Sequence, residues 1–191
     1  MKERIINEIL ESANIKRLIY EDNSIVKQIE KCAKNCIDAL SKGGKIIFCG
    51  NGGSFSDSQH LSAELIGRFA KDRDPLASIA LGTNTSSLSA IGNDLGYRYT
   101  FSRELEAIGN KKDFIIALST SGNSNNIIEL LNKAKSLKIK SLLLTGKKQS
   151  RASKLSESIF VPSLKTARIQ ECHIMIGQIV CGIIEDEIFP S

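Results

Sequence analysis

Two groups of polar side chains in this 191-residue sequence have the residue types and spacing for proton transfer or metal binding. His60 and Glu64 lie four residues apart in a segment with helical apolar periodicity, so they share one helical face. An imidazole and a carboxylate placed in this way form either a surface pair or two ligands of a divalent metal. Gln170, His173 and Gln178 interrupt an otherwise apolar segment, where polar groups need hydrogen-bond partners or a ligand.

Two turns rich in glycine and serine indicate binding of a small anion, such as a sugar phosphate. Residues 51–54 (Asn-Gly-Gly-Ser) follow one apolar run, and residues 119–124 (Ser-Thr-Ser-Gly-Asn-Ser) follow another. Each turn precedes a helical pattern, so unpaired backbone N–H groups meet the positive end of a helix dipole there. Ser54 and Ser56 are of the types that cap helices. The alternative for the second turn is a polar, capped helix start without a ligand.

The first turn does not satisfy the dinucleotide-binding pattern. Gly50 and Gly52 fit its first two glycines, but Phe55 stands at the third position. The next apolar run ends at Leu81 and Gly82 without the acid that would hold a ribose, and no lysine of a phosphate-binding loop is present. Nucleotide binding is therefore not expected.

The elements that must position these residues alternate between apolar strands and helices, which predicts an α/β fold with a doubly wound, five-stranded parallel sheet. Ligands bind such sheets at the carboxyl ends of the strands, where both turns fall. The expected strands are 45–49, 77–81, 113–118, 141–144 and 158–161, and the expected helices are 3–20, 24–42, 56–69, 86–92, 97–107, 125–137 and 166–187.

The chain is expected to form a single domain over 1–191, with an α/β core at 43–191 and an N-terminal helical arm at 1–42. The two helices of the arm precede the first strand, so they either fold back on the core or pack against another copy of the chain. We favour packing against another copy.

Composition is typical of a soluble globular protein, with 41% hydrophobic and 25% charged residues. No apolar run approaches the ~20 residues that span a bilayer, and the N-terminus does not resemble a secretory signal, so we expect a cytoplasmic protein without a membrane partner. The net charge of +5 is spread along the chain, which does not indicate a nucleic-acid partner. The five cysteines form no C-x-x-C pair and are expected to be buried free thiols.

Taken together and in order, several segments resemble the phosphoheptose isomerases, which are sedoheptulose 7-phosphate isomerases of the sugar isomerase (SIS) domain superfamily. The resemblance extends over nearly the whole chain. It is carried by residues 49–54, 59–60, 63–65, 67–69, 90–94, 119–124, 144–146 and 166–171, and by His173.

This resemblance implies a flavodoxin-like SIS domain that forms a homotetramer with active sites between subunits. It implies conversion of sedoheptulose 7-phosphate to D-glycero-D-manno-heptose 7-phosphate through an enediol, for surface polysaccharides such as lipopolysaccharide. Glu64 would move the proton, and one zinc ion per subunit would be held by His60, Glu64 and Gln170. The implied substrate contacts are Asn51, Gly52, Gly53, Ser54, Glu64, Asn93, Asp94, Ser119, Thr120, Ser121, Ser124 and Gln170.

One position departs from the family pattern. Eight residues after Gln170 the family places a histidine that serves as metal ligand and general acid, and this chain has Gln178. Glutamine does not exchange a proton near neutral pH and binds metal less well than imidazole. We expect weak zinc binding or slower catalysis, with water, the metal or His173 acting through a water in partial compensation.

The departure also keeps a second function open. The same fold resembles the DnaA-initiator-associating protein, a tetrameric binding module without isomerase activity. Loss of the acid histidine favours this alternative, whereas retention of His60, Glu64 and the Gly52–Gly53 pair favours the enzyme.

Overall fold

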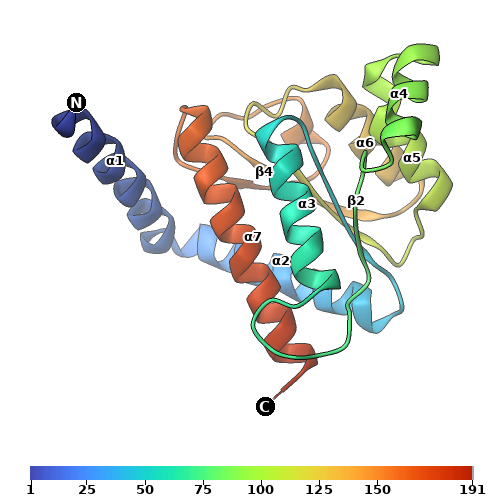
Figure 1. Cartoon of the computed structure of the whole chain (residues 1–191), viewed down its shortest axis with the longest axis horizontal. Coiled ribbons are helices and arrows are strands. Elements are labelled where there is room, and N and C mark those ends of the chain that lie inside the picture. Colours follow the sequence, from blue (N-terminus) through green and yellow to red (C-terminus); the bar gives the residue numbers. More distant parts are fainter. Residues whose placement is uncertain (191) are drawn as a thin grey trace.

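The computed structural model describes residues 1–190 and contains one parallel sheet with helices on both faces (Figure 1). Its strands lie in the order β2-β1-β3-β4-β5, and the register pairs Phe48 with both Ala80 and Ile116. The strands are β1 (Ile46–Gly50), β2 (Ser78–Ala80), β3 (Phe114–Ser119), β4 (Lys140–Thr145) and β5 (Glu157–Phe160). The expected doubly wound α/β fold is confirmed.

The α-helices are α1 (Lys2–Glu21), α2 (Asn23–Ser41), α3 (Gly53–Ile66), α4 (Thr85–Asp94), α5 (Thr100–Ile108), α6 (Asn125–Ser136) and α7 (Thr166–Ile188), and two short 3-10 helices cover Tyr97–Tyr99 and Ala152–Lys154. Helix α3 begins three residues before the expected position. Its N-cap is Gly52, whose φ of +56° suits glycine, and the cap has no side-chain hydrogen bond. Ser54 is buried inside the first turn, so the expected capping by Ser54 or Ser56 is wrong.

Alternate residues of each central strand point to opposite faces, and each face builds its own core. Phe48, Ile116 and Leu144 pack against α2, α3 and α7, whereas Cys49, Ala117 and Leu143 pack against α5 and α6. Strands that are buried on both faces explain the uninterrupted apolar runs of the sequence.

The two N-terminal helices behave differently from each other. Helix α2 packs on α7 and the sheet, and it buries Ile25, Ile29, Cys32, Ala33, Cys36 and Ala39 within its own chain. The expectation that both helices pack mainly on another copy is therefore wrong for α2. Helix α1 extends away from the core and buries only Ile15 and Ile19 (Figure 1).

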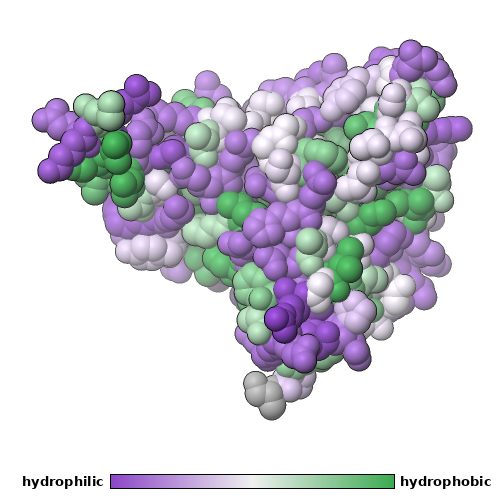
Figure 2. Space-filling view, in the orientation of Figure 1, coloured by the Kyte–Doolittle hydropathy of each residue, from purple (hydrophilic) through white to green (hydrophobic). Residues whose placement is uncertain are grey.

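An apolar surface covers the outer part of α1. Ile5, Ile6, Ile9 and Leu10 are all exposed, and Figure 2 shows the corresponding green patch at the N-terminal end of the molecule. Among the helices of residues 1–190, none has the length and apolar character to cross a membrane. All five cysteines are buried free thiols, as expected.

Candidate active site

The two turns predicted to bind an anion lie next to each other at the point where the strand order reverses. β1 and β3 are neighbours, and their connections leave the sheet toward opposite faces. In α/β sheets ligands bind in a crevice at such a point, and the region between the two turns is called the crevice below. A reciprocal amide pair joins them: Asn51 Nδ2 donates to Asn126 Oδ1 at 2.9 Å, and Asn126 Nδ2 donates to Asn51 Oδ1 at 2.8 Å. The Tyr97 hydroxyl donates to the same Asn51 oxygen at 3.1 Å. Asn51 is therefore fixed between both turns.

The serine loop, defined as residues 119–124, is ordered by its own hydrogen bonds. The Gly122 N–H donates to Ser119 Oγ at 3.1 Å, and the Asn123 N–H donates to Ser121 Oγ at 3.2 Å. Ser124 is the N-cap of α6, but its hydroxyl makes no capping hydrogen bond. The loop thus presents hydroxyls and a helix N-terminus together, which suits the several acceptor oxygens of a phosphate.

Gln170 lies against the first turn. A Cβ atom at Gly53 would fall 2.6 Å from Gln170 Nε2, so only glycine leaves room for this amide. Further along, a Cβ at Gly177 would meet Leu61 at 2.4 Å. These two contacts show that α3 and α7 run in the same direction, side by side (Figure 1).

His60 and Glu64 share one face of α3, as expected. His60 Nε2 lies 2.9 Å from Glu64 Oε1, and the two side chains are 50% and 20% exposed. The carboxylate is therefore partly sheltered and remains accessible from solvent. A partly buried carboxylate beside an imidazole is suited to proton transfer.

Asp57 lies one turn before His60 and was not selected from the sequence. Its Oδ2 is buried with no hydrogen-bond partner within residues 1–190. Burial raises the pKa of Asp57, and the charge of nearby His60 opposes this rise. A carboxyl three residues before His60 is the signal that would have identified it.

The side chains expected to hold zinc form an incomplete set of ligands. His60 and Glu64 supply two good ligands, but in the part of the chain that the structure describes no group of three or more His, Cys, Asp or Glu residues is arranged to hold a metal. The remaining candidates are the amide oxygens of Gln170 and Gln178, two residues separated by about 12 Å of rise along α7. The residues fit a weakly held ion better than a tight zinc site.

Gln178 and His173 occupy different environments on α7. Gln178 is partly exposed and follows Gly177, which faces Leu61 of α3. Along the two helix axes Gln178 therefore lies at nearly the same position as Leu61 and His60. His173 is fully buried, and neither ring nitrogen has a hydrogen-bond partner within residues 1–190. Burial lowers the pKa of His173 to about 4, so the ring is neutral at neutral pH; the nearby Thr145 backbone, which lies outside hydrogen-bonding geometry, opposes the shift only in part. Its position excludes, in the single chain, the water-mediated acid role that the sequence suggested.

Asn93 and Asp94 lie at the exposed C-terminal end of α4. Their side chains bond to each other, with Asn93 Nδ2 donating to Asp94 Oδ1 at 2.8 Å. They line an open depression with Ser86 and Ser89, and that depression contains none of the other expected site residues. The structure of the single chain therefore brings the two turns and Gln170 together. The His60–Glu64 pair lies on the same helix as the glycine turn, about 10 to 16 Å further along α3. Within residues 1–190, the side chains of Asn93 and Asp94 bond to each other and to none of these residues.

A buried ion pair fixes the far end of α3. The Glu185 carboxylate accepts hydrogen bonds from the Phe69, Ala70 and Lys71 N–H groups at 2.8–3.0 Å and from Arg73 Nε at 2.9 Å. These donors lower the pKa of Glu185 to about 2, although burial opposes the shift.

Arg73 connects this pair to the candidate catalytic helix. Its Nη2 donates to the Glu64 carbonyl at 2.9 Å, and its Nη1 donates to the Leu65 carbonyl at 2.8 Å. It therefore satisfies carbonyls at the end of α3 that have no partner within the helix. Neither Arg73 nor Glu185 was selected from the sequence, because their separation along the chain conceals the pairing.

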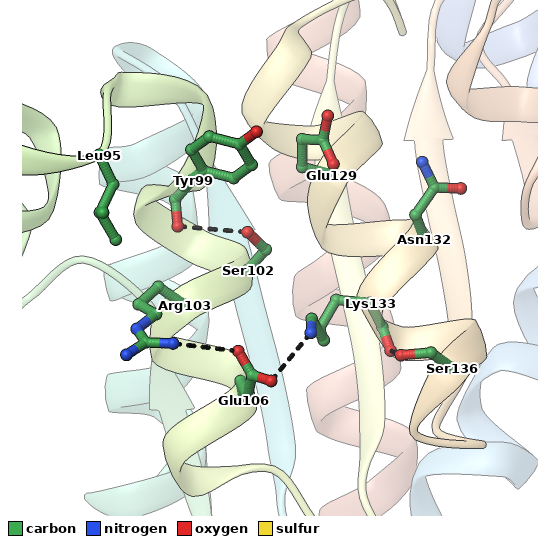
Figure 3. A pocket seen from close by; sticks show the side chains of 9 residues that line it. All are labelled: Leu95, Tyr99, Ser102, Arg103, Glu106, Glu129, Asn132, Lys133 and Ser136. Carbon is green, nitrogen blue, oxygen red and sulfur yellow. Dashed lines mark hydrogen bonds and ion pairs between the residues drawn. The ribbon is translucent and has the colours of Figure 1, made fainter.

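The groove between α5 and α6 lies outside this site. It has a volume of about 490 Å³ and is lined by residues that include Tyr99, Arg103 and Glu106 (Figure 3). Glu106 pairs across it with Lys133 at 3.0 Å and, within α5, with Arg103 at 3.5 Å. It contains none of the expected site residues.

The comparisons with known proteins agree with this geometry. The family model of the SIS domain matches residues 12–146. The chain is 46% identical to the phosphoheptose isomerase of Sulfurimonas denitrificans, over 99% of this chain and 97% of the relative. It is 51% identical to phosphoheptose isomerase 1 of Campylobacter jejuni, over 88% of this chain and 91% of the relative.

Two solved structures of phosphoheptose isomerases have the same fold. The structure from Neisseria gonorrhoeae has a TM-score of 0.90 at 35% identity and covers 97% of this chain and 98% of its own. The structure from Francisella tularensis has a TM-score of 0.91 at 32% identity and covers 97% of this chain and 99% of its own. The chain belongs to the phosphoheptose isomerase family of SIS-domain proteins.

Proposed function

We propose that this protein is an aldose-ketose isomerase that converts sedoheptulose 7-phosphate to D-glycero-D-manno-heptose 7-phosphate through an enediol. One observation supports the proposal above the others: α3 begins at the glycine turn and carries the His60–Glu64 pair, and Asn51 joins that turn to the start of α6, directly after the serine loop. Helix α3 thus carries both an anion-binding turn and a carboxylate that can exchange protons with solvent. The choice of substrate rests on the 46–51% sequence identity to phosphoheptose isomerases.

Each part of the crevice has a role in this reaction. Ser119, Thr120, Ser121 and Ser124 bind the phosphate and fix one end of the sugar. Next to them, Asn51, Gly52, Gly53, Ser54 and Gln170 hold oxygens along the sugar chain. Gly52 leaves space for the sugar, and Gly53 leaves space for the Gln170 amide.

Glu64 is proposed as the base that moves a proton between C1 and C2. A carboxylate takes the proton next to the carbonyl in the ketose and returns it to the neighbouring carbon of the enediol. The hydrogen bond from Arg73 to the Glu64 carbonyl fixes the backbone of this part of α3. Developing negative charge on the sugar oxygens needs hydrogen-bond donors, and the amide of Gln170 on the neighbouring helix α7 can act as one.

Zinc is proposed as a weakly bound cofactor, one per subunit, with His60 and Glu64 as its main ligands and Gln170 and Gln178 as weak ones. When bound, the ion would polarise the sugar carbonyl and stabilise the enediolate. The residues on α7 would then orient the sugar oxygens without exchanging protons themselves, because neither amide titrates near neutral pH.

A homotetramer with active sites between subunits is proposed for the assembled protein. One feature supports it: the exposed apolar surface of α1. Apolar patches of this kind mark protein–protein contacts. In this proposal the enzyme acts in the cytoplasm and its product enters surface polysaccharide such as lipopolysaccharide.

The decisive experiment is incubation of the purified protein with sedoheptulose 7-phosphate, with and without added zinc, and detection of the aldose. Replacement of Glu64 by Gln should lower kcat by about 10²–10⁴, because the base is lost while the side-chain shape is kept. The matched control is Glu30→Gln, which removes an exposed carboxylate on α2 and should leave kcat unchanged.

The non-catalytic alternative gives a different pattern. A binding module would form no aldose under any metal condition and would retain the DnaA initiator in a pull-down. Equal turnover by Glu64→Gln and the unsubstituted protein would refute the assignment of the base.

A further inference from the structure

A basic loop lies beside the serine loop and has no part in the roles described above. The basic loop, defined as residues 146–151, connects β4 to the 3-10 helix Ala152–Lys154 and carries Lys147, Lys148 and Arg151 without any acidic residue. All three cations are exposed. None of them takes part in the ion pairs found among residues 1–190. Three positive charges in six residues are therefore left without an internal counter-charge.

The basic loop is fixed to the serine loop through the backbone. The Gly146 N–H donates to the Thr120 carbonyl at 3.1 Å, and the Ala152 N–H donates to the Gly122 carbonyl at 3.0 Å. Ser150 is buried under Gly122, where a Cβ atom would fall 2.0 Å from Ser150 Oγ. The two loops therefore form one unit.

Arg151 contacts residues on both sides of the start of α6. Its N–H donates to Asn123 Oδ1 at 3.1 Å, and its Nη1 donates to Asn125 Oδ1 at 3.2 Å. Asn123 belongs to the serine loop, and Asn125 directly follows the N-cap Ser124. The guanidinium thus lies beside the helix end that meets the phosphate in the proposed reaction.

The serine loop itself contains only neutral groups. Hydroxyls and backbone N–H groups supply partial charges, whereas a sugar phosphate at neutral pH carries nearly two negative charges. A guanidinium is the side chain whose planar donors match two phosphate oxygens at once.

We infer that Arg151 binds the substrate phosphate and that Lys147 and Lys148 add longer-range attraction for it. The inference rests on the proposed function, because the phosphate belongs to that substrate. Arg151 exchanges its contact with Asn125 for phosphate oxygens when the sugar binds. It therefore determines specificity for phosphorylated over unphosphorylated sugars and takes no part in proton transfer.

The test is steady-state kinetics of Arg151→Gln with sedoheptulose 7-phosphate, with Lys154→Gln as the matched control. Lys154 is an exposed cation three residues further on, so its replacement removes the same charge outside the basic loop. We expect KM to rise about tenfold in Arg151→Gln with kcat within twofold, and both constants to stay within twofold in the control. Arg151→Lys should give an intermediate KM, since it keeps the charge and loses the planar fork.

Inorganic phosphate gives a readout that does not depend on turnover. Phosphate should raise the melting temperature of the unsubstituted protein and of Lys154→Gln, and about tenfold more phosphate should be needed for the same rise in Arg151→Gln. An active enzyme whose KM and phosphate response are the same in Arg151→Gln and Lys154→Gln would overturn this inference and leave the proposed function intact. A protein that responds to phosphate but forms no aldose would refute the proposed function instead.

Discussion

The buried ion pair between Arg73 and Glu185 gives a prediction whose size follows from its geometry. The two side chains are 1% and 2% exposed, and the carboxylate accepts four hydrogen bonds. Glu185→Gln keeps the shape, removes the charge and turns one acceptor into a donor that faces other donors. Breaking a buried pair in this way costs about 3–5 kcal/mol, because Arg73 stays buried without a counter-charge.

The assay is urea unfolding at pH 7 at a fixed protein concentration, since assembly would make stability depend on concentration. With a slope of about 1–3 kcal/mol per M, the midpoint should fall by at least 1 M. Asp186→Asn is the control, because Asp186 is 72% exposed and pairs only with Lys71, so its replacement should cost about 1 kcal/mol or less.

The pH dependence supplies an independent check. The pKa of Glu185 is lowered to about 2 in the folded protein from an ordinary value of 4.5. A lowered carboxyl pKa stabilises the folded state fully above pH 4.5, and this contribution is lost as the pH falls toward 2. The difference in the free energy of unfolding between the unsubstituted protein and Glu185→Gln should therefore shrink below pH 4.5. If Glu185→Gln lowers the free energy of unfolding by less than about 1 kcal/mol at pH 7, or by the same amount from pH 7 down to about pH 3, the reasoning is refuted.

Two further predictions concern α7 and the glycine turn. Gln178→His should raise zinc affinity at least tenfold in a chelator competition and should raise turnover, because imidazole is a better ligand and can exchange a proton; no gain in either measurement contradicts the proposed cost of the glutamine. Gly53→Ala should leave the urea midpoint unchanged or slightly higher, because alanine favours the helix and the Gln170 amide can move aside. The KM should nevertheless rise about tenfold, because the displaced amide no longer faces the crevice. An unchanged KM would show that Gln170 does not bind the sugar.

Much of the fold follows from local patterns in the sequence. Strands such as β3 are buried on both faces, so their apolar runs and the flanking helical periodicity suffice to predict a parallel sheet. The family motifs also assigned Gln170 and the glycine turn to one expected site, and the structure shows them in contact. The predicted start of α3 was wrong because the backbone conformation of Gly52 begins the helix, without the side-chain cap that the serines suggested.

The remaining errors arise from long-range packing. Helix α2 has the same amphipathic pattern whether it covers its own sheet or another copy, so periodicity alone did not show that it packs on α7. His173 looked like a candidate acid because a histidine interrupts an apolar helix, but its place on the core-facing stripe of α7 removes it from solvent. Arg73 and Glu185 are 112 residues apart and carry no shared motif, so only the folded chain shows their pairing.

The common direction of α3 and α7 has a consequence for how a substrate approaches. Helices that follow parallel strands begin at the same edge of the sheet, and here α3, α6 and α7 all start beside the crevice. Each start contributes roughly half a positive charge, so the three together resemble about one and a half fixed charges at that edge. The negative ends of these helices lie toward the opposite end of the sheet. A sugar phosphate diffusing toward the protein is therefore turned in the field so that its charged end arrives first, before any side chain touches it.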